Sequence, residues 1–69
     1  MNPDNLRLVG KVVCYQKELI SRAGLTFMRA NQGIHLGDIG LVVSQSVTEL
    51  QVLIKDQVAF FHISEVEAL

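Results

Sequence analysis

Three closely spaced glycines form the segment whose residue types come closest to a ligand-binding loop. Gly33, Gly37 and Gly40 are spaced GxxxGxxG. A phosphate-binding loop needs glycines that bring backbone N–H groups to the ligand, followed by Lys and Ser or Thr at the start of a helix. Here Leu41-Val42-Val43 follows, which is typical of a strand. The glycines therefore predict turns and strand bulges rather than a nucleotide site.

Residues that bind metals or act as nucleophiles are few and widely spaced. Zinc takes three or four N, S or O ligands, and His35 and His62 could supply two of them with Asp38 or Cys14, but no motif spacing supports such a site. Cys14 is predicted to point inward from a strand, where cysteine behaves as a small hydrophobic residue. A reactive thiol would need a nearby cation or a helix N-terminus. We therefore expect no catalytic residue, no metal and no cofactor, and a protein that is not an enzyme.

Aromatic and basic surfaces are the next possibility. Proline-rich peptides and methylated lysines bind to clusters of aromatic side chains, and this chain has one Tyr, three Phe and no Trp. The net charge of −1 also argues against nucleic acid. The first 30 residues nevertheless carry five Arg and Lys against two acidic residues. An RNA- or DNA-binding small barrel, Sm-like or KOW-like, is therefore the alternative function, with these cations as contacts: Arg7, Lys11, Arg22 and Arg29.

Size and composition describe one small domain over residues 1–69. The chain is 49% hydrophobic, which excludes a disordered tail. One cysteine excludes an internal disulfide, so extra stability for so small a core must come from close packing or a partner. The first residues lack the basic and apolar parts of a signal peptide, and no apolar run reaches the ~18 residues that span a bilayer. We expect a cytoplasmic location with Cys14 reduced.

Alternating apolar residues predict five short strands. The first covers residues 6–15, with Gly10 marking a bulge and these residues on the inward face: Leu6, Leu8, Val12 and Cys14. The others are predicted over 39–46, with Gly40 as a second bulge position, and over 49–55, 58–62 and 67–69. In 49–55, Leu50, Val52 and Ile54 are expected to point inward.

A single helical turn is predicted over residues 63–66, with Ser64 placed to cap it. Five strands at this spacing, with a long first connection and a one-turn helix before the last strand, predict an all-β fold: a small five-stranded SH3-like barrel. The long first connection, residues 16–33, allows two interpretations. Apolar residues recur at helical spacing, but Gly24 is central, so a long ordered loop with strand character is favoured over a short helix.

Two segments carry a resemblance to known proteins. The run from Gly33 to Val43, followed by the run from Phe60 to Leu69, resembles the small photosynthetic SH3-like barrels. These include the variable chain of ferredoxin-thioredoxin reductase, the photosystem I subunit at the ferredoxin docking site and a ferredoxin-binding subunit of the NDH-1 complex. The resemblance covers residues 33–69 and implies a small accessory subunit of a larger redox or photosynthetic complex.

The connection between the first two strands holds the best candidate contact surface. Several of its apolar side chains have little left to bury against if the strands fill the core, and cations lie among them. An apolar patch rimmed by cations is typical of a protein interface, although the segment could instead complete the core. We expect a non-catalytic protein-protein interaction or assembly module, with a protein partner or a homo-oligomer, and with these partner-binding residues: Leu19, Ile20, Arg22, Leu25, Phe27, Met28 and Arg29.

Overall fold

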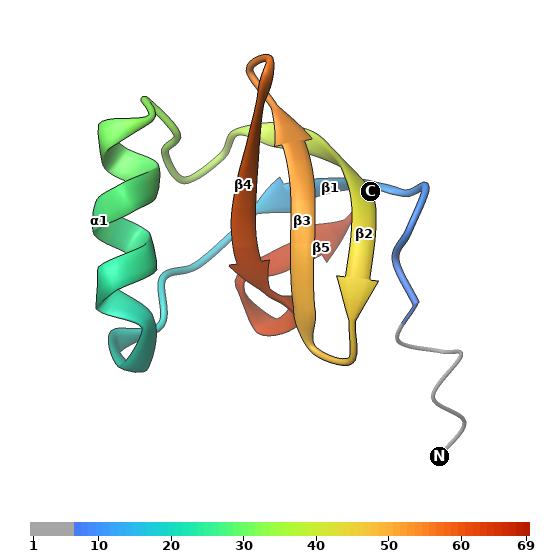
Figure 1. The fold of residues 1–69 in the computed structure, drawn as a ribbon, viewed down its shortest axis with the longest axis horizontal. Helices are drawn as coiled ribbons and strands as arrows, with labels where there is room; N and C mark the ends of the chain where they lie inside the picture. The colour runs from blue at the N-terminus through green and yellow to red at the C-terminus, as the bar shows by residue number, and fades with distance from the viewer. Residues whose placement is uncertain (1–6) are drawn as a thin grey trace.

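The computed structural model describes residues 7–69 and has a five-stranded antiparallel sheet with one short α-helix (Figure 1). The elements follow in this order: β1 (Val12–Tyr15), the 3₁₀ turn η2 (Ile20–Arg22), α1 (Ala23–Asn31), β2 (Ile39–Ser46), β3 (Glu49–Ile54), β4 (Gln57–His62), the 3₁₀ turn η3 (Ile63–Glu65) and β5 (Val66–Ala68). The mainly β class and the turn before the last strand agree with the sequence prediction.

The sheet curls but does not close. Its strand order is β4-β3-β2-β1-β5, and Figure 1 shows β1 and β5 crossing behind the upright strands β2, β3 and β4. Among the described residues, no ladder joins β4 to β5. The helix α1 lies beyond the β4 edge.

Alternation along the strands builds the core. In β3, Leu50, Val52 and Ile54 are buried as predicted, and in β4 Ala59 and Phe61 point inward in the same way. Successive side chains of a strand point to opposite faces, so the residues between them face outward. The rest of the core comes from β1, β2 and the α1–β2 connection: Val13, Tyr15, Val42 and Ile34.

The first strand corrects two predictions. β1 begins at Val12 instead of residue 6, because Gly10 lies in a turn with φ of 85° and not in a strand bulge. Its inward residues are Val13 and Tyr15, whereas Cys14 is half-buried and Val12 is exposed. Within β1 the predicted faces were therefore inverted, whereas Leu8, before the strand, packs against the core as predicted. Leu6 lies outside the described residues.

Residues 16–33 are mainly helical, so the favoured loop interpretation was wrong and the helical alternative holds. The η2 turn runs directly into α1, which ends near Gly33 at φ of 78°. Gly24 lies in the first turn of the helix with nothing within 4 Å of a Cβ placed there. A glycine at such an open position costs about 1 kcal/mol of helix stability relative to alanine, which packing can outweigh.

The second strand needs Gly40 for close approach rather than for a bulge. A Cβ at this position would lie 2.6 Å from Val52 Cγ1 and 2.8 Å from the carbonyl oxygen of Leu53. The register irregularity of β2 against β3 occurs instead between Val42 and Ser44. Gly40 therefore lets β2 lie directly against the neighbouring strand's core side chains.

The turn η3 is capped by His62 instead of Ser64. His62 Nδ1 accepts a hydrogen bond of 3.0 Å from the Ser64 backbone N–H, and Glu65 Oε1 accepts one of 2.8 Å from the His62 backbone N–H. This reciprocal arrangement satisfies two N–H groups at the start of the turn. It also fixes where Glu65 points, which is into the protein interior.

The helix is attached to the outer edge of β4 by side chains. Gln32 Nε2 donates to the Val58 carbonyl at 3.3 Å, and Arg29 Nη1 donates to the Phe60 carbonyl at 2.6 Å. Gln57 Nε2 donates in return to the Gln32 carbonyl at 2.8 Å. Polar groups of α1 and of its C-cap residue, Gln32, therefore face the sheet.

Candidate interaction surface

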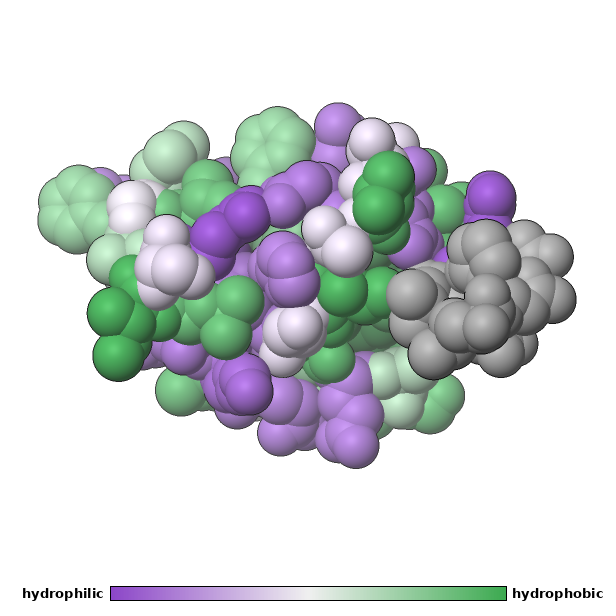
Figure 2. All heavy atoms as spheres, turned by 90° about the horizontal axis from the view of Figure 1, so that it is seen from below, coloured by the Kyte–Doolittle hydropathy of each residue, from purple (hydrophilic) through white to green (hydrophobic). Residues whose placement is uncertain are grey.

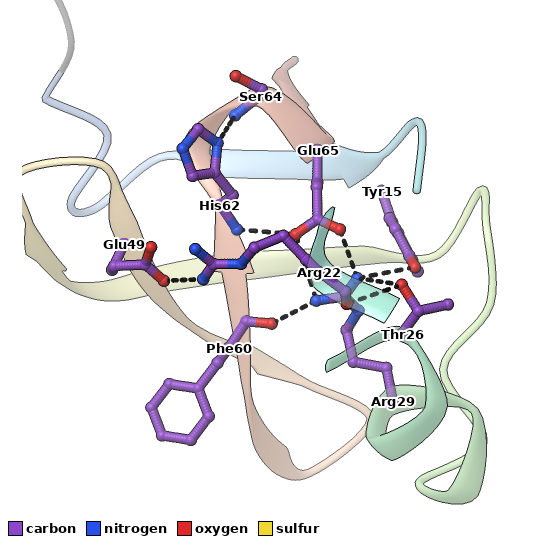
Figure 3. Close-up of polar contacts among 9 residues, drawn as sticks. All are labelled: Tyr15, Arg22, Thr26, Arg29, Glu49, Phe60, His62, Ser64 and Glu65. Carbon is purple, nitrogen blue, oxygen red and sulfur yellow. Dashed lines mark hydrogen bonds and ion pairs between the residues drawn. The ribbon is translucent and has the colours of Figure 1, made fainter. Parts of the chain in front are cut away.

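The inward face of α1 is organised around a buried ion pair. Arg29 and Glu65 are 1% and 0% exposed, and Arg29 Nη2 lies 2.6 Å from Glu65 Oε2. The same nitrogen donates to Tyr15 Oη at 3.0 Å and to Thr26 Oγ1 at 3.3 Å. Figure 3 shows these groups converging from β1, α1, β4 and η3. Arg29 thus ties the helix to strands from both ends of the chain.

Aromatic rings complete the surroundings of the guanidinium. Its central carbon lies 4.8 Å from the Tyr15 ring centre and 4.5 Å from the Phe61 ring centre, distances at which a cation is attracted to the ring face. The two rings meet edge to face with centres 5.0 Å apart. Arg29, predicted at the contact surface, is instead a buried structural residue. A buried charge without a partner is costly, and that is why Arg29 points toward Glu65 instead of solvent.

Arg22 is also turned toward the sheet. Its guanidinium forms an ion pair with Glu49 at the start of β3 (Figure 3). This hydrogen bond lowers the pKa of the Glu49 carboxyl and raises the pKa of Arg22. Both arginines of the predicted contact surface are therefore engaged within the molecule. Arg22 keeps partial exposure at the margin of the helix, with a side chain 26% exposed.

The outward side of the helix carries apolar residues. Ile20, Phe27 and Met28 are 96%, 69% and 53% exposed. At 100° per residue Phe27 and Met28 share one side of α1 with Ala23 and Gly24, which are also exposed, and the exposed Ile20 precedes them in η2. We call these five residues the α1 outer face. In Figure 2, seen from below, green side chains gather at the left end of the molecule, where α1 lies in Figure 1. Of the other predicted contact residues, Leu19 and Leu25 are half-buried.

A hollow adjoins this face. Its volume is about 260 Å³, and it lies where η2 joins α1. The residues that line it are Glu18, Leu19, Ile20, Ala23 and Thr26. The α1 outer face therefore combines protruding apolar side chains with an indentation next to them.

A second apolar area lies on the outer side of the sheet. Val12 pairs with Leu41, Leu41 with Leu53, and Leu53 with Val58, so one row of apolar side chains crosses β1 to β4. Each keeps between 38% and 46% of its surface exposed. Sequence reasoning identified these as strand residues but missed the row, because it depends on register between strands. The hollow was missed because three of its lining residues are not large apolar side chains, so the apolar pattern of the sequence does not single them out: Glu18, Ala23 and Thr26.

The described residues give little support for a metal site, a membrane-spanning helix or a nucleic-acid surface. Within residues 7–69, no three His, Cys, Asp or Glu side chains lie close enough to hold a metal ion. No helix in that range is long and apolar enough to cross a membrane. Of the four cations in the nucleic-acid alternative, Arg29 is buried and Arg22 is bonded to Glu49.

Comparison with protein-family models, with curated proteins and with solved structures found no match to this chain.

Proposed function

We propose that this protein is a non-catalytic interaction module that binds a protein partner through the α1 outer face. The observation that carries the proposal is the inverted polarity of the helix. A surface helix ordinarily turns its apolar stripe toward the core and its charged side toward water. Here Arg29 is buried while Ile20 and Phe27 are exposed.

Burial of this face would supply part of the free energy of binding. Full burial of an aliphatic or aromatic side chain contributes about 1.5–3 kcal/mol. Scaled by the exposed fractions of Ile20, Phe27 and Met28, this amounts to roughly 3–6 kcal/mol before the cost of association. That is the size of contribution expected from the central anchors of an interface.

The charge around the face favours a protein partner over a membrane or nucleic acid. Helices that lie on membranes carry Lys and Arg along their polar side, and phosphate backbones are bound by clustered cations. The two cations of η2 and α1 bond within the molecule, Arg22 to Glu49 and Arg29 to Glu65. Within η2 and α1 the exposed side carries no charged residue, and its apolar side chains lie beside the polar Ser21 and Asn31.

We further propose that the fold is a small SH3-like barrel that stays open between β4 and β5, and that the protein serves as an accessory subunit of a larger complex. The strand order β4-β3-β2-β1-β5 and the 3₁₀ turn before the last strand support the barrel. The resemblance of residues 33–69 to photosynthetic small barrels supports the accessory role, with redox or photosynthetic complexes as the first class to examine.

The test is quantitative affinity capture from extracts of the source cells with the tagged chain and its Phe27→Asp variant. An Asp in the apolar face removes an anchor and buries a charge on binding, so recovery of the partner is expected to fall by at least about tenfold. Because Phe27 is 69% exposed, the variant should keep the circular dichroism spectrum of the parent.

The matched control is Val47→Asp. Val47 is 84% exposed in the β2–β3 turn and is not part of the α1 outer face, and its φ of 55° suits Asp better than Val. This variant should capture the partner as the parent does. Equal recovery by all three proteins, or unfolding of the Phe27 variant, would show that the α1 outer face is not a contact surface.

A further inference from the structure

We infer that the occupant of the α1 outer face is a second copy of this chain, with the two helices packed antiparallel about a two-fold axis. The inference deepens the proposed function and rests on it. A two-fold interface uses one patch on both subunits, so the patch must be complementary to itself. The α1 outer face meets that condition in its shape, in its charge and in how closely it lets a second helix pack against it.

Shape provides the first argument, because the face holds both a protruding group and a place to receive it. The Phe27 ring projects from one turn of α1, and the hollow of about 260 Å³ lies at the other end of the same face. A cavity of about 150 Å³ is large enough for a benzene ring. When antiparallel helices are centred on Gly24, Phe27 of each copy lies level with residue 21 of the other. Residue 21 does not line the hollow itself, but two lining residues, Ile20 and Ala23, lie on either side of that level.

Charge is the second argument. In a two-fold pair each side chain near the axis meets its own kind, so a charged residue there would be repelled. None of the five residues of the α1 outer face is charged, and the one charged residue that lines the adjoining hollow, Glu18, lies at its end away from Gly24 in the sequence. Both arginines of the helical segment are neutralised inside each chain, Arg29 by Glu65 and Arg22 by Glu49.

The third argument is close approach. Gly24 is exposed at the middle of the face, and nothing lies within 4 Å of the position of its missing Cβ. A glycine flanked by Ala23 lets a partner helix come nearer than the usual interaxial distance of about 8–10 Å. Close helix packing would therefore explain why Gly24, which lowers helix stability, lies in α1.

The area sets the strength that this pairing can reach. From their exposed fractions, the apolar residues of the face offer on the order of 500 Å² per copy, or about 1,000 Å² for a pair, near the lower limit for a specific interface. We therefore expect a dimer whose population depends on concentration instead of an obligate one.

The experiment is sedimentation velocity on the full chain from about 10 µM to about 1 mM, the range suited to an interface of this size. The expected result is a monomer–dimer equilibrium. Raising the salt from about 50 mM to about 500 mM should leave the dimer unchanged or strengthen it, because no ion pair crosses the interface. A dimer that dissociates in salt would contradict the apolar pairing.

Gly24→Glu is the variant that separates association from folding. Glu has the higher helix propensity, and a carboxylate in the first turn of α1 is favourable to the helix dipole, so the melting temperature of the monomer should rise. The same side chain brings two charges together at the two-fold axis, so dimer formation should weaken by at least about tenfold. Val47→Asp should dimerise as the parent does.

The outcomes distinguish this inference from the proposed function. A chain that is monomeric at every concentration, or a Gly24→Glu variant that dimerises as well as the parent, overturns the two-copy inference. Capture of a different protein that depends on Phe27, by a chain that stays monomeric, would overturn it while leaving the interaction module in place. Loss of dimerisation in Gly24→Glu, with a raised melting temperature, supports both the pairing of two copies and the use of the α1 outer face as an interaction surface.

Discussion

The Arg29–Glu65 pair allows a double-mutant cycle whose outcome follows from its burial. The three variants are Arg29→Met, Glu65→Gln and the two together. Met fills much of the Arg side-chain path without a charge, and Gln keeps an acceptor oxygen for the His62 backbone N–H, which Glu65 Oε1 accepts at 2.8 Å. Each single variant leaves one charged group buried without its partner, whereas the double variant leaves none.

The expected magnitudes come from that difference. Breaking a buried pair by removing one member costs about 3–5 kcal/mol, because the remaining charge is uncompensated. Stability of roughly 0.05–0.15 kcal/mol per residue gives this chain of 69 residues about 3–10 kcal/mol in total. Each single variant should therefore lose between about a third and all of its stability. The double variant should recover about 2–4 kcal/mol relative to the sum of the singles.

Urea denaturation followed by circular dichroism measures these values, since the chain has no Trp for fluorescence. A single variant that loses less than about 1 kcal/mol would show that the site admits water or relaxes around the charge. Additive losses, with the double variant as unstable as the sum, would refute the reasoning that the two groups stabilise each other.

Two further predictions concern surface carboxyls and one glycine. Hydrogen bonds from the His35 backbone and from Lys55 lower the pKa of Asp38, as Arg22 lowers the pKa of Glu49. A carboxyl whose pKa is lower in the folded state adds stability that is complete above its unfolded pKa, so urea midpoints should be constant above about pH 5 and fall from there toward about pH 3. The decrease in the urea midpoint should be shallower in Glu49→Gln. An unchanged slope would show that the pH dependence comes from other carboxyl groups. Gly40→Ala should lower the melting midpoint, at a cost of about 1–3 kcal/mol, because its Cβ would meet the neighbouring strand at 2.6 Å; a neutral result would mean that β2 can move away.

Sequence patterns predicted the elements that alternate cleanly. β3 places apolar residues at every second position, and its buried set matched the prediction residue by residue. β1 was assigned the wrong faces because Val12, Val13 and Cys14 are apolar in succession, so alternation alone does not determine which side is inward. The outcome depends on Gly10, whose turn sets where the strand begins.

The candidate site was predicted in part, because its helix reverses the usual polarity. The apolar residues of 16–33 were correctly singled out, and Ile20, Phe27 and Met28 are exposed. Arg29 was assigned to the surface because a lone Arg near apolar residues ordinarily lies at the rim of a patch. Its partner Glu65 is 36 residues away, and no local pattern links two positions at that separation.

The attachment of α1 to β4 has a consequence for how these molecules behave at high concentration. An edge strand with free carbonyls is a template on which another chain can add a strand, which is a common start of aggregation. The Val58 and Phe60 carbonyls of β4 are already bonded to Gln32 and Arg29. Growth of the sheet by strand addition at this edge is therefore blocked, even though apolar side chains lie exposed beside it, and copies that meet here do so through side chains instead of backbone.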